Sequence, residues 1–207
     1  MHEDEPVTTY AVASDTWEPW HQNYLYGAFY LFPPDPVRER VNAWRTKFDP
    51  SSQAICEAHV SLTVPLPRPL TVRDAAEVSV VLATHAPLDL QWGPPWQYPG
   101  IPGAVLRIEP AAAVAALVTA LESCAVFQGA PPRRYPFSPH MTVAEFVDQQ
   151  QTEAILAALA GEEATGQWRC TAVSYAAPDT AFHFTKRRVW LLAENAKCSA
   201  STIPDTA

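Results

Sequence analysis

Two short segments repeat one pattern, and this repeat restricts the possible folds more than any other feature of the sequence. AHVSL contains His59 and Ser61, and PHMTV contains His140 and Thr142, so each has a histidine, an apolar residue, a hydroxyl residue and a second apolar residue. Side chains of a strand alternate between its two faces. Each segment therefore predicts a strand with an imidazole and a hydroxyl on one face and apolar side chains on the other.

The surrounding sequence alternates between strand-like and helix-like segments. Apolar runs bounded by Pro or turn residues predict strands, and apolar residues at helical spacing, such as Val41, Trp44 and Phe48 after Asp35 and Pro36, predict helices. This order predicts an α+β or mixed α/β domain in which helices pack on a sheet. The expected strands are residues 24–32, 58–66, 88–92, 104–109, 139–146, 168–177 and 183–193, and the expected helices are residues 36–48, 72–85, 110–127 and 150–160.

The length of the chain, 207 residues, fits a single domain with terminal additions. Residues 1–23 show no clear period, and we expect them to form an extended or loosely docked N-terminal arm that Trp17 and Trp20 anchor. The domain itself is expected at residues 24–193. Residues 194–207 are expected to form a disordered tail.

The charge of the chain limits the kind of partner that it can have. The formal net charge is −8, whereas proteins that hold long nucleic acids by their phosphates usually display a basic face. We therefore expect a small anionic substrate or a nucleic-acid end, and no long duplex. The acidic start MHEDEP is unlike a secretory signal, and no apolar run is long enough to span a membrane. These features favour a cytoplasmic monomer without membrane contact.

The four polar side chains of the repeat suit one kind of chemistry. Two histidines can act as general base and general acid near neutral pH, and two hydroxyls can donate hydrogen bonds to an oxyanion. If the two polar faces oppose each other across a cleft, a phosphodiester between the imidazoles can be attacked on one side and lose its leaving group on the other. The histidine faces carry no carboxylate and the four cysteines have no metal-like spacing, so we expect neither a metal nor a cofactor.

The two motifs, HVSL and HMTV, resemble the paired signature of the 2H phosphoesterase superfamily, which includes the so-called 2′-5′ RNA ligases and cyclic nucleotide phosphodiesterases. YGAFYLFPPDPVRERVNAWR is similar to the first strand and helix of that family, and FSPHMTVAEF is similar to its second-motif strand. The resemblance covers roughly residues 25–193. Ser61 stands where Thr is commoner in the family, and serine keeps the hydroxyl.

The resemblance implies a bilobal α+β fold with two similar antiparallel-sheet-plus-helix lobes around a central cleft. It implies metal-independent hydrolysis of a cyclic phosphodiester, a 2′,3′-cyclic nucleotide or RNA end, to a 2′-phosphate. His59 and His140 would be catalytic, and Ser61 and Thr142 would bind the phosphate. By the same resemblance, His140 would activate water and His59 would protonate the leaving oxygen.

Two groups of residues near the motifs are candidates for contacts with the rest of the substrate. The first group precedes the second motif and comprises Arg133, Arg134 and Tyr135. These side chains could reach a phosphate or stack on a base, and a solvated loop is the alternative. The second group lies in or near the Pro-rich residues 93–103 and comprises Trp92, Trp96 and Tyr98. They form either a stacking wall or ordinary packing under a stiff loop.

Two other functions are compatible with the same residues. The site can run backward as a 2′-5′ RNA ligase, or the chain can be a nucleotide- or RNA-binding protein without turnover. A binding protein would not need a histidine in both motifs, so the sequence favours an enzyme. Replacing either histidine distinguishes the two classes, because an enzyme loses turnover while its binding persists.

Overall fold

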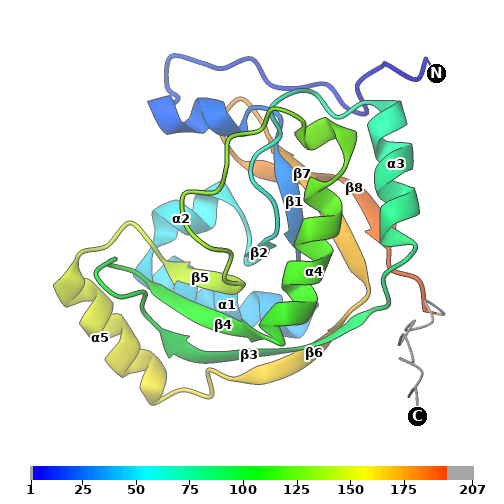
Figure 1. Cartoon of the computed structure of the whole chain (residues 1–207). Coiled ribbons are helices and arrows are strands. Elements are labelled where there is room, and N and C mark those ends of the chain that lie inside the picture. Colours follow the sequence, from blue (N-terminus) through cyan, green and yellow to red (C-terminus); the bar gives the residue numbers. More distant parts are fainter. Residues whose placement is uncertain (1, 195–207) are drawn as a thin grey trace, which may run out of the picture.

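The two motif strands lie at the centre of a single antiparallel sheet. A computed structural model describes residues 2–194 of the chain (Figure 1). Its eight strands follow the order β6-β3-β4-β5-β2-β1-β7-β8 across the sheet. The strands are β1 (Ala28–Leu31), β2 (Val60–Ser61), β3 (Leu88–Trp96), β4 (Ala104–Glu109), β5 (His140–Ala144), β6 (Gly166–Cys170), β7 (Ala172–Pro178) and β8 (Phe184–Leu191).

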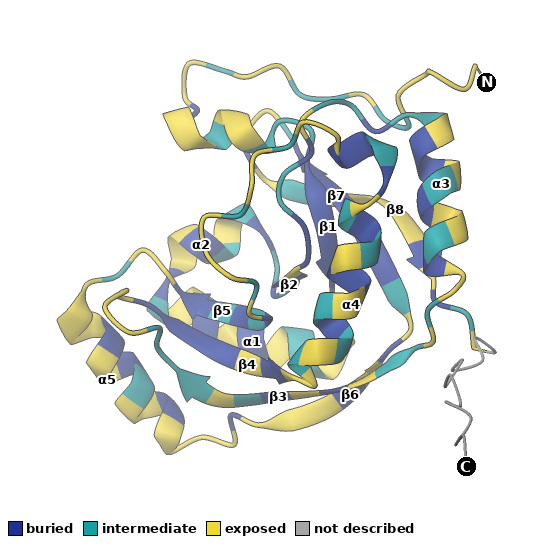
Figure 2. Ribbon diagram, viewed as in Figure 1, coloured by how far each residue is buried: buried dark blue, intermediate teal, exposed yellow. Residues whose placement is uncertain are grey.

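Helices cover the sheet and bury its apolar side chains. α1 packs against β5 and α2, α3 against β8 and α4, α4 against β4, and α5 against β3 and β4. Apolar residues of α1, α3, α4 and α5 join one core cluster with the sheet (Figure 2). The helices are α1 (Asp35–Phe48), α2 (Pro50–Ile55), α3 (Val72–Leu82), α4 (Ala111–Glu122) and α5 (Gln149–Ala160), with 3-10 helices η1 (Pro19–Tyr24) and η2 (Ala125–Phe127).

The sheet consists of two similar halves that join at the motif strands. One half is β2-β1-β7-β8 and the other is β6-β3-β4-β5, and Val60 pairs with Met141 where they meet. In the first half, β1 and the helices α1 and α2 precede the motif strand β2, and β2 pairs with β1. In the second half, β4 and the helix α4 precede the motif strand β5, and β5 pairs with β4. The α+β fold with two related halves, predicted from the sequence, is confirmed.

Two elements are divided in the structure where the sequence predicts one continuous element. The strand expected at 168–177 is two strands, broken at Thr171. β6 pairs with β3 and β7 pairs with β1, so the two segments serve opposite halves of the sheet. The helix expected at 110–127 ends at Glu122 as α4 and is followed by the separate η2.

The strands expected at 24–32 and 58–66 are both shorter in the structure. β1 begins after Gly27, whose φ is +70° and whose missing Cβ would lie 2.1 Å from the Ala176 carbonyl oxygen, so only glycine fits there. β2 ends early because the Thr63 hydroxyl accepts a hydrogen bond from the Phe29 amide at 3.2 Å. A side chain thereby replaces a carbonyl of the regular ladder.

The N-terminal segment is docked along its length. The Val7 amide donates to the Leu70 carbonyl and the Val72 amide to the Glu5 carbonyl, both at 2.9 Å. The Tyr10 hydroxyl accepts from the Leu70 amide at 2.8 Å. The boundaries 1–23, 24–193 and 194–207 stay predictions, and the expected tail lies outside the described residues except for Glu194.

Among the helices that the structure describes, none is long and apolar enough to cross a membrane.

Candidate active site

The motif strands are hydrogen-bonded neighbours, which differs from the expectation that they oppose each other across a cleft. Because β2 and β5 are antiparallel with Val60 opposite Met141, the register places Ser61 opposite His140 and His59 opposite Thr142. Each histidine therefore has the hydroxyl of the other motif beside it. The four side chains form the floor of the site, and other segments form its walls.

The predicted alternation of polar and apolar side chains is present in both strands. Val60 and Met141 are fully buried in the core, and His59 and His140 are half-buried on the opposite face. On that face lies a cavity of about 270 Å³. Its lining includes all four motif side chains together with Trp20, Tyr24, Tyr30, Arg45, Ile55, Cys56, Glu145, Phe182 and Phe184.

Both imidazoles are held in the same tautomer by the backbone. The Nδ1 of His59 lies 2.7 Å from the Glu57 carbonyl oxygen, and the Nδ1 of His140 lies 2.8 Å from the Ser138 carbonyl oxygen. A carbonyl oxygen only accepts, so both Nδ1 atoms carry a hydrogen. Each Nε2 therefore has a free lone pair on the side of the ring away from its own strand. Two imidazoles in the same tautomer therefore line one cavity.

The two histidines differ in their electrostatic surroundings. Burial, together with the positive charge of Arg45, lowers the pKa of His59 to about 4. Burial also lowers the pKa of His140, but the Ser138 carbonyl and the carboxylate of Glu145 counteract it. Both imidazoles are therefore neutral at pH 7, and His59 is the harder one to protonate.

Arg45 is a buried cation directly behind the site. Its guanidinium donates to the carbonyl oxygens of Thr142 at 2.6 Å, Ser52 at 2.7 Å and Cys56 at 2.9 Å. Its Nε has no hydrogen-bond partner among the described residues. The carboxylates of Glu145 and Asp49 favour its charge, but burial lowers the pKa of Arg45. A cation in this position favours an anion in the cavity.

Two other cavity side chains bear on the chemistry. Tyr30 is buried, packs edge-on against His59 at 4.9 Å between ring centroids, and its hydroxyl makes no hydrogen bond to another described residue. That hydroxyl is a donor without a protein partner in the wall of the cavity. Burial raises the pKa of the Cys56 thiol to about 12, so Cys56 is not a nucleophile at neutral pH.

A second, larger cavity of about 670 Å³ adjoins the first and shares Tyr24, Ser61 and His140 with it. Tyr98 forms part of its wall, and the Tyr98 hydroxyl lies 3.3 Å from the Ser138 carbonyl and 3.1 Å from His140 Nδ1. The Pro-rich segment therefore braces the second histidine. Trp92 is instead buried in the core, and Trp96 packs on Arg107. Both lie in β3, which continues past the strand expected at 88–92 into the Pro-rich residues, so neither packs under a loop.

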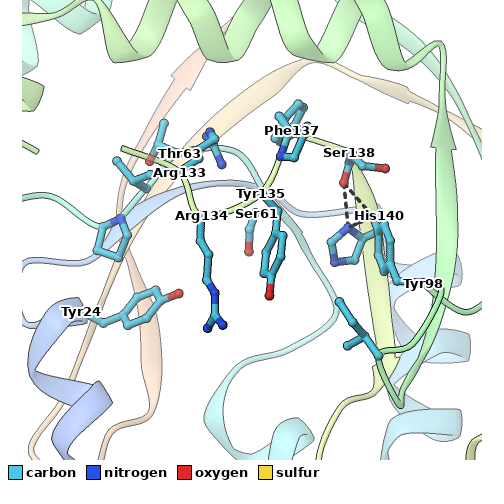
Figure 3. A pocket seen from close by; sticks show the side chains of 14 residues that line it. Tyr24, Ser61, Thr63, Tyr98, Arg133, Arg134, Tyr135, Phe137, Ser138 and His140 are labelled. Atoms are coloured by element: carbon cyan, nitrogen blue, oxygen red, sulfur yellow. Dashed lines mark hydrogen bonds between the residues drawn. The ribbon is translucent and has the colours of Figure 1, made fainter. Parts of the chain in front are cut away.

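The residues predicted just before the second motif separate into two roles. Figure 3 shows Arg134 and Tyr135 extending into the larger cavity, and both are exposed. Arg133 turns back toward the body, where its guanidinium binds Glu122 and the Leu62 carbonyl. Arg134 makes no ion pair within residues 2–194, so it is the member of the pair that is free to meet an anion.

Sequence reasoning missed Arg45 and Tyr30, and only Arg45 gave a signal. Arg45 lies on the same helical face as Val41, Trp44 and Phe48, which is an unusual place for a charge. Tyr30 lies in an apolar run in which a hydroxyl facing a cavity cannot be distinguished from one in a core. No group of three or more His, Cys, Asp or Glu side chains within residues 2–194 is arranged to hold a metal ion.

Comparison with known proteins gives one family and one fold. The family model of the 2′-5′ RNA ligase superfamily matches residues 33–180. No curated protein matches the sequence.

Solved structures with this fold share little sequence with the chain. E. coli LigT complexed with 3′-AMP matches with a TM-score of 0.55 and 19% identity over 80% of this chain and 96% of that one. The complex of the same protein with NADP+ matches at 0.53 and 20%, with the same coverage. The protein TT0787 of Thermus thermophilus matches at 0.58 and 16%, over 81% of this chain and 98% of that one.

Proposed function

Because the chain belongs to the 2′-5′ RNA ligase superfamily, we propose that it hydrolyses a cyclic phosphodiester, a 2′,3′-cyclic nucleotide or RNA end, to a 2′-phosphate. One observation carries the proposal: both motif histidines donate Nδ1–H to a carbonyl and keep a basic Nε2 for one shared cavity. A pair of imidazoles in the same tautomer beside one cavity suits a reaction in which one proton is removed and another is supplied.

The proposed reaction needs only groups of this chain and water. One neutral imidazole takes a proton from water as its oxygen bonds to phosphorus. The bond from phosphorus to the 3′-oxygen breaks, and the other imidazole, protonated, gives its proton to that oxygen. Ser61 and Thr142 donate hydrogen bonds to the non-bridging oxygens, and Arg45 favours their negative charge from behind. Proton exchange with solvent restores both rings.

The direction of proton transfer stays a prediction. Family resemblance makes His140 the base and His59 the acid. The surroundings of the ligand-free site favour the reverse, because burial and Arg45 disfavour a protonated His59, whereas Glu145 favours a protonated His140. A bound phosphodiester anion raises the pKa of both rings. The two assignments predict that different variants, His59→Ala or His140→Ala, lose the acidic limb of the pH–rate profile.

The larger cavity favours one alternative activity. In ligation through a 2′-5′ bond, the 5′-hydroxyl of a second RNA end replaces water as the nucleophile at the same phosphorus, and the same bond to the 3′-oxygen breaks. This reaction needs room for that second end beside the histidines. The adjoining 670 Å³ with the exposed Arg134 provides such room. LigT was solved with 3′-AMP and with NADP+, which supports a small nucleotide as the ligand here. The cytoplasmic, monomeric and metal-independent character stays a prediction.

Phosphorus NMR of the purified protein in EDTA tests the proposal. The four nucleoside 2′,3′-cyclic monophosphates are offered separately, and the wild type is expected to produce 2′-phosphates. His59→Ala and His140→Ala should lose most of this turnover while still binding the nucleoside 2′-monophosphate. His183→Asn, an exposed histidine outside both cavities, is the matched control and should behave like the wild type. Binding without any turnover would refute the proposal in favour of a binding protein.

A further inference from the structure

The N-terminal segment contributes a wall to the candidate site, although the family model begins only at residue 33. Trp20 and Tyr24 of η1 line the same cavity as His59 and His140. The opposite end of the chain contributes Phe182 and Phe184 from the β7–β8 hairpin. Together with Tyr30, five aromatic side chains outside the family match therefore lie around the phosphate site that the two motifs form.

The segment is fixed to the hairpin by specific contacts. The Trp17 indole Nε1 donates to the Thr180 carbonyl at 2.9 Å, and Trp17 is buried. The His21 ring stacks on Phe182 with 3.6 Å between centroids and 15° between planes. Phe182 has a φ of 63°, a conformation that is costly for a bulky residue. The strained backbone conformation therefore belongs to the residue of the hairpin whose ring stacks on His21 of η1.

Trp20, which lines the cavity, and Phe146, whose ring lies near that of Trp20, both stay open to solvent. Trp20 is 37% exposed and Phe146 is 51% exposed, and their centroids are 6.3 Å apart. The Trp20 Nε1 donates to Glu18 at 2.8 Å, and the Phe146 amide donates to Asp49 at 3.0 Å. Both residues are thus held in place before any ligand arrives. A patch of exposed apolar rings beside a cavity marks a candidate binding surface.

We propose that Trp20, with Phe146 beside it, stacks on the nucleobase of the substrate whose phosphate lies between the two histidines. The inference rests on the proposed function and names the side chain that selects a nucleotide over a cyclic diester without a base. A flat ring is the group that such a surface accepts, because every base has a π-face that can stack on an aromatic side chain. Trp20 lines the cavity that holds the histidines, so the base and the phosphate of one nucleotide can occupy it together. The larger cavity with Arg134 is left for the nucleotides on the 5′ side of a longer RNA end.

Two substrates with the same reacting ring test the proposal. Adenosine 2′,3′-cyclic phosphate and glycerol 1,2-cyclic phosphate both contain a five-membered cyclic diester, but only the first has a base. The quantity measured is the ratio of kcat/KM for the nucleotide to kcat/KM for the glycerol compound. Trp20→Ala should lower this ratio by about 5- to 150-fold, the range for losing one base–aromatic stack. Trp20→Phe, which keeps a ring, should retain most of it.

The controls keep the outcome decisive. Val12→Ala changes an exposed residue of the same segment that lines neither cavity, and it should leave the ratio unchanged. Unfolding by urea shows whether Trp20→Ala is folded. If folded Trp20→Ala keeps the ratio of the two kcat/KM values within twofold of the wild type, the stacking proposal is overturned. Normal turnover of the nucleotide in that variant would leave the proposed function intact.

If neither cyclic diester is turned over, the proposed function fails and calorimetry decides the inference separately. Adenosine 2′-monophosphate and inorganic phosphate are then titrated into the wild type and Trp20→Ala. Selective weakening of adenosine 2′-monophosphate binding supports the stacking surface. Equal binding by both proteins refutes it.

Discussion

The partial burial of His59 beside Arg45 predicts a specific sensitivity of the fold to acid. Its pKa in the folded protein is about 4 against an ordinary value of 6.5. Between these values the unfolded chain binds a proton that the folded chain does not, so stability is lost as the pH falls from about 6.5 to about 4. At about 1.4 kcal/mol per pKa unit the full loss is about 3 kcal/mol. Water in the cavity reaches part of the ring and reduces the loss to about 2 kcal/mol.

The variant His59→Asn removes this titration, since an amide has no proton to gain. Urea unfolding at several pH values from 4 to 7.5 gives the free energy of unfolding of both proteins. The wild type should lose about 2 kcal/mol more than the variant across this range. NMR titration of the imidazole should place its pKa near 4. Equal acid sensitivity in the two proteins, with a His59 pKa above about 6, would refute the reasoning.

Four further substitutions test the surroundings of the histidines. Tyr30→Phe should lower kcat by about tenfold, because the transition state loses one hydrogen bond to a charged oxygen. The urea midpoint should not fall, because the Tyr30 hydroxyl has no partner among the described residues. An unchanged kcat contradicts this role of Tyr30. Arg45→Met should destabilise the protein by about 3 kcal/mol, since three carbonyls lose their donor, and NMR should show the pKa of His59 rising from about 4 toward its ordinary value. Arg134→Ala should raise KM for an RNA end about fivefold, the effect of losing one exposed charge contact. Arg133→Ala should mainly lower the urea midpoint, because Arg133 binds Glu122 and a carbonyl oxygen. If Arg133→Ala raises KM and Arg134→Ala lowers the midpoint instead, the two roles are exchanged.

The repeat made the central strands predictable, because a period of two is a local property. His59 and His140 lie on the polar faces of β2 and β5 as alternation requires, and Val60 and Met141 are buried. The pairing of the two strands was not predictable. Two motif strands can lie side by side in one sheet or face each other across a cleft, depending on which strands each pairs with. The alternation of residues within one strand does not determine its pairing partner.

The walls of the site show the same limit more strongly. Trp17 reaches a carbonyl 163 residues away in the sequence, and no period in residues 1–23 indicates that contact. Arg133 and Arg134 are adjacent and chemically identical, yet Arg133 binds Glu122 and Arg134 extends into the larger cavity. Tertiary packing, which short-range patterns do not encode, decides between them.

Steady-state kinetics of a double-mutant cycle tests the two-histidine mechanism most directly. The rates kcat/KM for a 2′,3′-cyclic nucleotide in EDTA are compared for the wild type, His59→Ala, His140→Ala and the double variant. If the two rings act in one transition state, each single change should cost about 10²- to 10⁴-fold, and the double variant should lose little more than the worse single one. Losses that multiply, or a single variant that keeps a tenth of the activity, would contradict the mechanism.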